Sequence, residues 1–223
     1  MDAAALELKL SLLAPTAVGF AIELASGSAF GLLEGEGAIV ERAIEPRKKE
    51  FAAGRRAARR ALSAIDIPNQ PILADAERTP IWPAGTVGSI SHANGVCAAV
   101  AAPSQAYKSL GLDIEQTAAL DQCLWAEILT DRELSWLNTQ AADDRGWLAK
   151  AIFSAKESAY KCQFPLTRTM FGFHQLQITF DLEMSEFEAE FLEGFGEFSA
   201  GDRLKGRLTS ARDFVMCLAF IPC

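Results

Sequence analysis

The most regular pattern of apolar and polar positions lies in residues 147–161 (WLAKAIFSAKESAYK). An apolar stripe follows one side of the helix that this stretch predicts, made by Leu148, Ile152, Ala155 and Ala159. The opposite side is polar and consists of Lys150, Ser154, Glu157 and Lys161. Glu157 and Lys161, one turn apart, form either an ordinary exposed ion pair, worth roughly 0.2–0.5 kcal/mol, or part of a site.

A second helix is predicted over residues 46–65, because Pro46 suits a first helical turn. We expect Phe51, Ala58, Leu62 and Ile65 to form its buried side, and Arg47, Arg55 and Arg59 to share an exposed one. A strand over residues 16–24, a glycine-rich connection over 27–35 and a short helix over 36–44 precede it. The connection lacks the lysine and the spacing of a P-loop.

A hairpin is predicted where Ala93-Asn94-Gly95 separates residues 87–92 (VGSISH) from 96–102 (VCAAVAA). Asn-Gly is a strong signal for such a turn, because both residues tolerate positive φ. We expect Ser91 and His92 at the exposed end of the hairpin. His92 is then either a solvated side chain or a phosphate ligand.

Two acids alternate with apolar residues in the strand predicted over residues 110–115 (LGLDIE). Leu112 and Ile114 point to one face, while Asp113 and Glu115 point to the other, roughly 7 Å apart along the strand. Neighbouring carboxylates repel each other, and a bound Mg²⁺, which prefers hard oxygen ligands, would resolve that conflict. Two acids on a strand are common, so this signal is weak by itself.

The remaining pattern predicts an α+β fold. Helices are expected over residues 118–130 and 131–138, followed by a loop over 141–146. From residue 172 the period changes to two, with strands in residues 175–182, 186–191, 203–208 and 214–221. Acidic outward positions on one strand and basic ones on the next predict cross-strand ion pairs.

The composition and net charge indicate a globular protein and argue against some classes of partner. Half of the 223 residues are hydrophobic and 22% are charged, which is typical of a globular chain with a core. The net charge of −8 argues against general binding to nucleic acids or anionic membranes. Residues 47–60 nevertheless carry seven basic residues and one acid, Glu50, which indicates either a site for a small polyanion or a solvated basic helix face.

The compartment is predicted to be the cytoplasm. Five cysteines without CxxC spacing indicate reduced, mostly buried thiols. The N-terminal stretch MDAAALELKL carries acids where a signal peptide would carry bases, and no apolar run is long enough to span a bilayer. We also expect a monomer.

Four segments together resemble the 4′-phosphopantetheinyl transferase superfamily, in its surfactin- and enterobactin-synthetase-associated type. They are RKKEFAAGR (residues 47–55), WPAGTVGSISH (82–92), GLDIE (111–115) and FSAKESAYK (153–161). Residues 163–173 (QFPLTRTMFGF) look like the family's segment after the catalytic helix. The resemblance implies two similar α/β subdomains, antiparallel sheets with packed helices, over residues 1–110 and 111–223.

The resemblance also implies an activity and a set of site residues. The family transfers the 4′-phosphopantetheine moiety of coenzyme A (CoA) to a serine of an apo acyl or peptidyl carrier protein. By motif match, Mg²⁺ on the CoA pyrophosphate would be held by Asp113, Glu115 and Glu157. The CoA phosphates would be contacted by Arg47, Arg55, Ser91, His92 and Lys161, with Arg78 a further candidate.

Several roles stay open at this point. Lys161 would stabilise the leaving group, and Glu157 is either the general base or only a metal ligand. Glu133 matches an acidic position of the family, but Thr130–Glu133 reads equally as a capping box. The alternatives to transfer are a Mg²⁺-dependent hydrolase of CoA or nucleotide pyrophosphates and a non-catalytic protein that binds CoA or a carrier.

Overall fold

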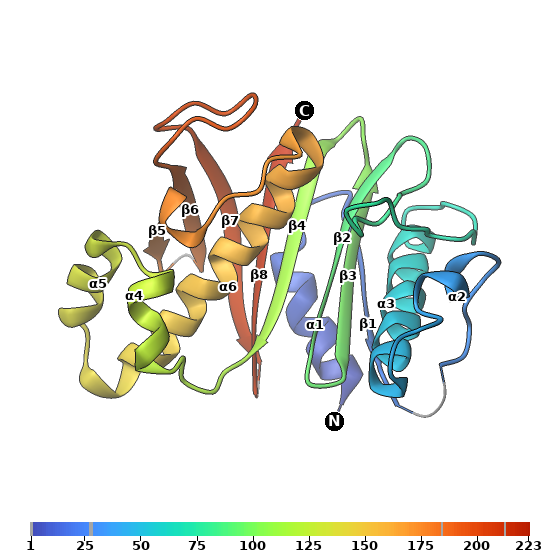
Figure 1. Ribbon diagram of the computed structural model, residues 1–223, viewed down its shortest axis with the longest axis horizontal. Coiled ribbons are helices and arrows are strands. Elements are labelled where there is room, and N and C mark those ends of the chain that lie inside the picture. The colour runs from blue at the N-terminus through green and yellow to red at the C-terminus, as the bar shows by residue number, and fades with distance from the viewer. Residues whose placement is uncertain (1, 27–28, 184, 212) are drawn as a thin grey trace.

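The computed structural model describes residues 2–26, 29–183, 185–211 and 213–223, which form two antiparallel sheets with packed helices, as the α+β prediction requires (Figure 1). The first sheet has the order β1-β3-β2, with β1 at Gly19–Leu24, β2 at Thr86–Ala93 and β3 at Val96–Pro103. The second has the order β4-β8-β7-β6-β5. Its strands are β4 (Tyr107–Gln116), β5 (Leu176–Asp181), β6 (Glu186–Phe191), β7 (Arg203–Ala211) and β8 (Phe214–Pro222).

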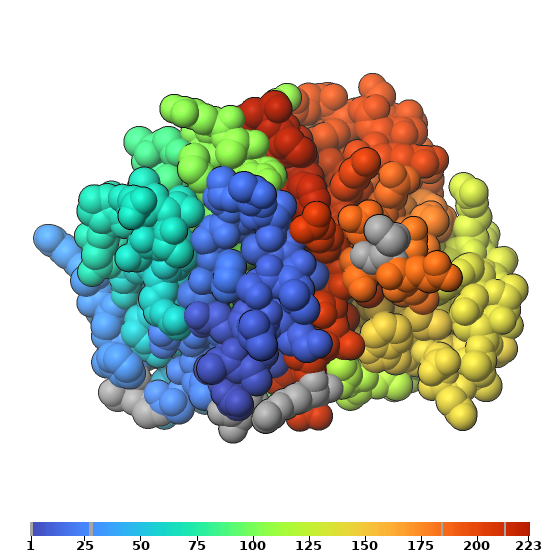
Figure 2. Space-filling view, turned by 180° about the vertical axis from the view of Figure 1, so that it is seen from behind, coloured from blue at the N-terminus to red at the C-terminus, as the bar shows by residue number. Residues whose placement is uncertain are grey.

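One long helix covers the front of each sheet. Helix α3 (Glu45–Ser63) packs on the first sheet and α6 (Ala142–Thr167) on the second (Figure 1). Helix α1 (Ala3–Leu13) lies behind both sheets, between the strands of the first half and the red C-terminal strands (Figure 2). The shorter helices are α2 (Glu36–Ile39), α4 (Trp125–Ile128) and α5 (Asp131–Asn138), with 3-10 turns η1 (Gln122–Leu124) and η2 (Phe173–Gln175).

The core has a continuous part behind the sheets and a separate part under each front helix. Leu6 and Leu10 of α1 pack with Val100 of the first sheet and Leu112 and Met216 of the second. This shared apolar layer makes α1 a common cover for both sheets. Within the described ranges, no helix has the length and apolar composition needed to cross a membrane.

The two sheets meet where β2 and β4 lie side by side, and serine side chains connect them. The backbone N–H of Leu112 donates to Oγ of Ser89 at 2.9 Å, and the N–H of Ile114 donates to Oγ of Ser91 at 3.3 Å. Ser89 and Ser91 are two residues apart and therefore point to the same side of β2. Their hydroxyls accept hydrogen bonds from β4 that a backbone carbonyl would accept within a sheet.

Helix α6 approaches β4 closely at Gly111. A Cβ atom at Gly111 would lie 1.9 Å from the carbonyl oxygen of Ser158 and 2.4 Å from the backbone N of Cys162. Glycine is therefore required for this helix–strand contact. The contact sets the height of Glu157 and Lys161 above the strand that carries Asp113.

The predicted hairpin is confirmed. Asn94 (φ 44°) and Gly95 (φ 75°) both occupy the left-handed region between β2 and β3. The cross-strand ion pairs of the second sheet are also present, since Arg203 contacts Glu188 at 3.1 Å and Glu190 at 2.9 Å. All five cysteines are free, and Cys97, Cys162 and Cys217 are buried.

Three element predictions are wrong in their bounds. The helix expected over residues 118–130 is only the 3-10 turn η1 and the four residues of α4. The expected loop over 141–146 is the first turn of α6, where Asp143 and Asp144 suit the positive end of the helix dipole. The short helix expected over 36–44 ends at Ile39.

The exposed basic face predicted for residues 46–65 is wrong for two of its three arginines. Arg55 and Arg59 are buried, and Arg59 donates to both oxygens of Glu36, at 2.7 and 2.9 Å. Glu36 is fully buried and also accepts from the N–H groups of Leu33 and Ile72. This ion pair therefore fixes the loops around α3 to the helix and leaves no charge free for a ligand.

Candidate functional site

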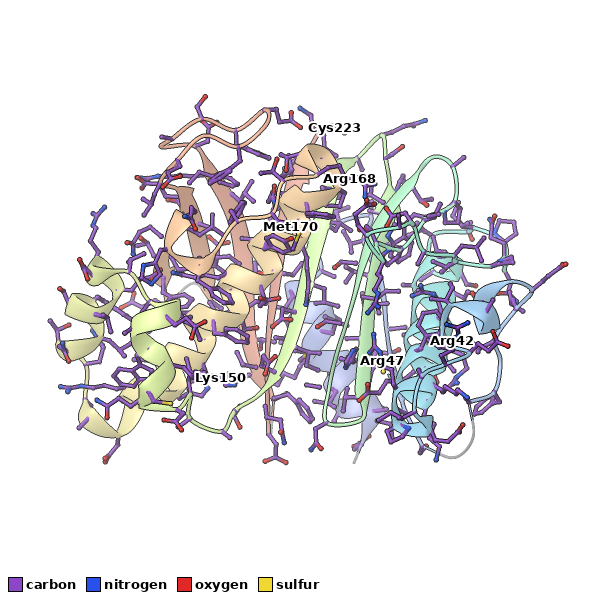
Figure 3. The ribbon with its side chains drawn as sticks, in the orientation of Figure 1. Arg42, Arg47, Lys150, Arg168, Met170 and Cys223 are labelled. Atoms are coloured by element: carbon purple, nitrogen blue, oxygen red, sulfur yellow. The ribbon has the colours of Figure 1, made fainter. Side chains whose placement is uncertain are left out.

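One cavity of about 580 Å³ is bounded by α3, β2, β4 and α6. It lies between the two halves of the chain, which are the first sheet with α3 and the second sheet with α6. All of the site residues predicted from the sequence line it: Arg47, Arg55, Arg78, Ser91, His92, Asp113, Glu115, Glu157 and Lys161. Figure 3 shows Arg42 and Arg47 on the α3 side and Lys150 on the α6 side. The structure thus brings together segments that lie far apart in the chain.

Asp113 is the buried centre of this site. One carboxylate oxygen, Oδ1, accepts from Nζ of Lys161 at 2.6 Å and from Oγ of Ser91 at 3.0 Å. The other, Oδ2, accepts from Oγ of Ser154 at 2.8 Å. These contacts come from β2 and α6, so Asp113 joins the two halves of the chain through its side chain.

Two further carboxylates face the same cavity. Burial raises the pKa of Glu115, and the nearby charge of Asp113 raises it further. Burial likewise raises the pKa of Glu157, with Asp113 and Glu115 adding to the effect and Lys161 opposing it. Lys150 lies 3.5 Å from Glu115, and Lys161 lies 4.0 Å from Glu157. The three acids are therefore only partly neutralised by the protein.

This donor set fits a divalent cation in its chemistry. Three carboxylates around one cavity, two of them with pKa values raised by burial and by their neighbours, offer hard oxygen ligands that gain from a bound cation. Among the described residues, however, no three His, Cys, Asp or Glu side chains are gathered as a ready-made metal site. The ammonium of Lys161 lies against Asp113 instead.

The opposite wall of the cavity is basic. Arg47 donates through Nη1 to Nε2 of His92, which requires that nitrogen to carry no proton. Burial lowers the pKa of His92, and the charges of Arg47 and Lys161 lower it further, against Glu50 and Asp113. Glu50 lies 3.4 Å from Arg47 and 3.7 Å from His92. His92 thus lies beside an arginine, and its pKa is below the usual range.

Two of the predicted ligands are more buried than expected. Arg55 stacks on the ring of Phe51 and donates to the carbonyl of Ile72 at 2.7 Å, and burial lowers its pKa to about 10. Ser91, expected at the exposed end of the hairpin, is only 6% exposed. It is covered because the hairpin lies against β4 rather than projecting into solvent.

Three lining or adjoining residues were not predicted as site residues. Arg42 lines the cavity and has no ion-pair partner among the described residues. Lys150 and Ser154 were recognised only as part of the polar side of the helix, although they contact Glu115 and Asp113. The only signal for them was their spacing of three to seven residues before Glu157.

A second cavity of about 640 Å³ adjoins the first and is largely apolar. The two share Arg78, Pro80, Ile90 and Lys161. Its other walls include Ile81, Trp82, Tyr160, Phe164 and Met170. The backbone of Arg78 is in the left-handed region (φ 65°), at a turn between the two cavities.

Glu133 does not line either cavity, and the capping box is confirmed. Thr130 and Glu133 cap α5 reciprocally, with bonds of 3.2 and 2.8 Å. Glu133 also accepts from the N–H of Ile178 at 2.6 Å and from Nζ of Lys156 at 2.7 Å. Its partner Lys156 is 1% exposed, so this ion pair anchors α6 to the elements beside it.

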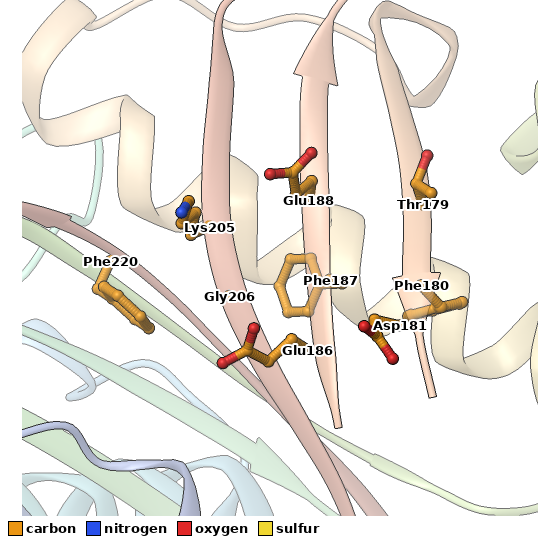
Figure 4. A pocket seen from close by; sticks show the side chains of 9 residues that line it. All are labelled: Thr179, Phe180, Asp181, Glu186, Phe187, Glu188, Lys205, Gly206 and Phe220. Atoms are coloured by element: carbon orange, nitrogen blue, oxygen red, sulfur yellow. The ribbon is translucent and has the colours of Figure 1, made fainter. Parts of the chain in front are cut away.

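A hollow of about 270 Å³ at the strands β5 to β8 is separate from the site (Figure 4). The ring of Phe187 lies over Gly206, where a Cβ atom would be 2.1 Å from the ring. Glu186, Glu188 and Lys205 surround it. It shares no lining residue with the other two cavities, so it has no part in the chemistry of the site.

The sequence matches two family descriptions in succession. Residues 35–102 match the 4′-phosphopantetheinyl transferase N-terminal domain, and residues 109–217 match the 4′-phosphopantetheinyl transferase superfamily. Svp, a 4′-phosphopantetheinyl transferase of Streptomyces mobaraensis, is 36% identical over 77% of this chain and 70% of its own length. Npt, a 4′-phosphopantetheinyl transferase of Nocardia iowensis, is 34% identical over 65% of this chain and 64% of its own length.

Enterobactin synthase component D of Salmonella typhimurium is also similar, with 36% identity over 60% of this chain. The match spans 55% of that protein and 64% of Npt, which is less than two thirds of either relative. The resemblance inferred from the four sequence segments is confirmed by these matches.

Proposed function

This chain belongs to the 4′-phosphopantetheinyl transferase superfamily, and on that premise we propose that it transfers the 4′-phosphopantetheine moiety of CoA to a serine of an apo carrier protein. Adenosine 3′,5′-bisphosphate is the other product. The transfer needs a site that holds a polyanion, places the pyrophosphate beside positive charge and admits a protein hydroxyl.

The observation that carries the proposal is the division of one cavity into a basic and an acidic wall. Arg42, Arg47, Arg55, Arg78 and His92 supply donors for the phosphates of CoA. The acidic wall and Lys161 lie opposite, where the pyrophosphate would sit. A divalent cation such as Mg²⁺, held by Asp113, Glu115 and Glu157, would add positive charge next to the pyrophosphate oxygens.

The adjoining apolar cavity suits the transferred half of CoA. It meets the site cavity at Arg78 and Lys161, which is where the pyrophosphate would end and the pantetheine chain would begin. Trp82, Tyr160 and Phe164 offer apolar surface for that chain. Lys161 then lies at the junction, beside the bond that breaks.

The reaction itself is an exchange of one oxygen for another at phosphorus. The hydroxyl of the carrier serine attacks the β-phosphorus, the pyrophosphate P–O bond breaks, and negative charge grows on the α-phosphate that leaves. Lys161 stabilises that charge through its ammonium. Glu157 takes the serine proton directly or through water, and its raised pKa brings it nearer the range of a useful base.

Several properties of the whole protein stay predictions. They are the division at residues 110 and 111, the monomeric state, the cytoplasmic location and the absence of nucleic-acid or membrane partners.

The test is to incubate the chain with CoA, Mg²⁺ and an apo carrier protein and to weigh the carrier by mass spectrometry. A phosphopantetheine adduct on the carrier serine is expected. Cleaved CoA without an adduct would indicate a hydrolase, and intact CoA with an unmodified carrier would indicate a binding protein. Glu157→Gln should lose the adduct, whereas Asp143→Asn, an exposed acid in the first turn of the same helix, should keep it.

A further inference from the structure

Ser91 has no hydrogen-bonding capacity left for a ligand. A serine hydroxyl has one proton and two lone pairs. The proton of Ser91 goes to Oδ1 of Asp113 at 3.0 Å. The lone pairs accept from the N–H of Ile114 at 3.3 Å and from Nζ of Lys161 at 3.2 Å.

Ser154 approaches the same carboxylate from the other side. It is fully buried in α6 and donates to Oδ2 of Asp113 at 2.8 Å. It does not line the site cavity, so it cannot touch CoA in this arrangement. A buried carboxylate costs free energy unless such donors surround it, and here they also fix its rotation.

We infer that Ser91 and Ser154 are positioning residues that hold Asp113 between the two halves of the chain, with Ser91 also holding Lys161. The inference rests on the proposed function, because it concerns the geometry of that reaction. It changes the role that the family resemblance implies for Ser91, from a contact with CoA to a contact with Asp113 and Lys161.

The chain offers a matched control for each serine. Ser89 lies two residues before Ser91 on β2, is 7% exposed and accepts from the N–H of Leu112. It lines the apolar cavity and does not contact Asp113, so Ser89→Ala controls for the loss of a buried hydroxyl between the two sheets. Ser158 lies one turn after Ser154 on α6, is fully buried and donates to the carbonyl of Ala155. Each control loses a buried hydroxyl from the same element.

The experiment compares Ser91→Ala with Ser89→Ala and Ser154→Ala with Ser158→Ala. We expect Ser91→Ala and Ser154→Ala to lower kcat by roughly 10- to 100-fold, the effect of one lost hydrogen bond to a charged group. KM for CoA should change by less than about threefold, because neither hydroxyl serves the substrate. Ser91→Thr, which keeps the hydroxyl, should recover most of the rate.

A second measurement is the binding of CoA without metal, by calorimetry. Ser91→Ala should bind CoA as the parent does, since Ser91 has no proton free for a phosphate. Weaker binding by Ser91→Ala alone would make Ser91 a direct ligand and overturn the inference. Equal kcat for Ser154→Ala and Ser158→Ala would overturn it for Ser154.

The proposed function and the positioning role fail in different ways. A parent protein without transfer activity would refute the proposed function. An active parent whose Ser91 and Ser154 variants behave like their controls would refute the positioning role alone. If Ser91→Ala does not fold, a Ser91→Thr variant with the kcat of the parent supports the role, and one with a tenfold lower kcat contradicts it.

Discussion

Lys161 is closer to Asp113 than to the acid on its own helix. Its Nζ lies 2.6 Å from Oδ1 of Asp113 but 4.0 Å from Glu157, one turn before it. The predicted pair of Glu157 and Lys161 is therefore present, but the shortest contact of Lys161 is with Asp113. The ammonium instead connects the helix to the strand that carries the acids.

This contact gives Asp113, Glu157 and Lys161 different expected responses to Mg²⁺. Asp113→Ala should lower the transfer rate roughly 10- to 1000-fold, with partial recovery at high Mg²⁺, because it removes a metal ligand. Lys161→Ala should lower kcat while the Mg²⁺ dependence stays close to that of the parent. The measurement is a Mg²⁺ titration of the transfer rate for each variant.

Glu157→Gln decides between the two roles left open for this residue. If Glu157 is ligand and base, excess Mg²⁺ does not restore the rate. Full recovery at high Mg²⁺ would make it a ligand only. Variants that all follow the parent's Mg²⁺ dependence would contradict the three-carboxylate site.

Arg47 is expected to act in CoA binding rather than in the chemical step. Its side chain is 48% exposed and lines the cavity, where it contacts His92 and lies 3.4 Å from Glu50. Arg47→Ala should raise KM for CoA about 5- to 50-fold, the loss of one charge–phosphate contact, with little change in kcat. Lys48→Ala, a half-buried neighbour that is paired with Glu45 and does not line the cavity, is the control and should change neither constant. An unchanged KM for Arg47→Ala would show a merely solvated side chain.

His92 is expected to take up a proton when CoA binds. Burial and the nearby arginine and lysine place its pKa below the usual 6.5 in the free protein, whereas a phosphate contact favours the charged ring and raises that pKa. Between the two pKa values, binding takes up protons, so affinity should increase as the pH falls through that window. Calorimetry at pH 6.5 in buffers of different ionisation enthalpy gives the number of protons taken up per CoA bound. This number should be lower by up to about one for His92→Asn than for the parent. Equal uptake would place the phosphates elsewhere.

The sequence identified most of the charged residues of the site, but it missed Arg42 and did not reveal the contacts between the side chains. Every residue that the motifs selected for the site does line the cavity. Arg55 is buried by a loop that contains Ile72, and Ser91 is buried by β4. Both contacts join segments far apart in the chain, so a local sequence pattern cannot predict them. Ser154 was placed on a polar helix side that instead faces a buried carboxylate.

Among the elements, those with a regular period could be predicted and those without it could not. The helices α3 and α6 and the paired strands follow clear apolar patterns. Helix α1 was not predicted, because its leucines occur on several sides: Leu6 and Leu10 are buried, whereas Leu8 and Leu12 are exposed. Which side of such a helix is buried depends on the sheets against which it packs, and the sequence of the helix alone does not show this.

Substitution of Gly111 should destabilise the contact between α6 and β4. Gly111→Ala would place a Cβ atom against the backbone of α6 and push the helix from β4, so we expect a loss of about 1–3 kcal/mol or more. The corresponding drop in Tm is roughly 3–10 °C, with activity lost in parallel. Gly37→Ala, in an exposed helix with open space around the new Cβ, should be neutral or gain about 0.5–1 kcal/mol. Equal Tm values for the two variants would contradict the close approach.

In the whole molecule, the halves are joined by bonds of very different strength. The ion pair of Arg168 and Asp75 is 2.6 Å long, but the arginine side chain is 52% exposed, and such pairs contribute about 0–1 kcal/mol. Ser89→Ala would instead leave the buried N–H of Leu112 without its acceptor, at a cost of about 1–3 kcal/mol.

Urea unfolding of Ser89→Ala and Asp75→Asn measures this difference. The serine variant should lose more stability and exchange the Leu112 amide hydrogen faster. A larger loss in Asp75→Asn would mean that the surface ion pair, and not the serine contacts, holds the halves together. The sequence could not reveal this connection, since the partners lie 23 residues apart on strands of different sheets.

The serine contacts between β2 and β4 belong to a wider pattern that bears on aggregation. The outermost strands of the two sheets are β1, β2, β4 and β5. On β1, Ile22 donates to Glu7 and accepts from Arg60, and on β5, Ile178 donates to Glu133. Side chains thus occupy backbone groups on three of these four strands, β1, β4 and β5, where a strand of another molecule would otherwise pair. The fourth, β2, lies against β4. The serines that join the two sheets, together with the charged side chains on β1 and β5, should therefore also disfavour strand-to-strand pairing between separate copies of this chain.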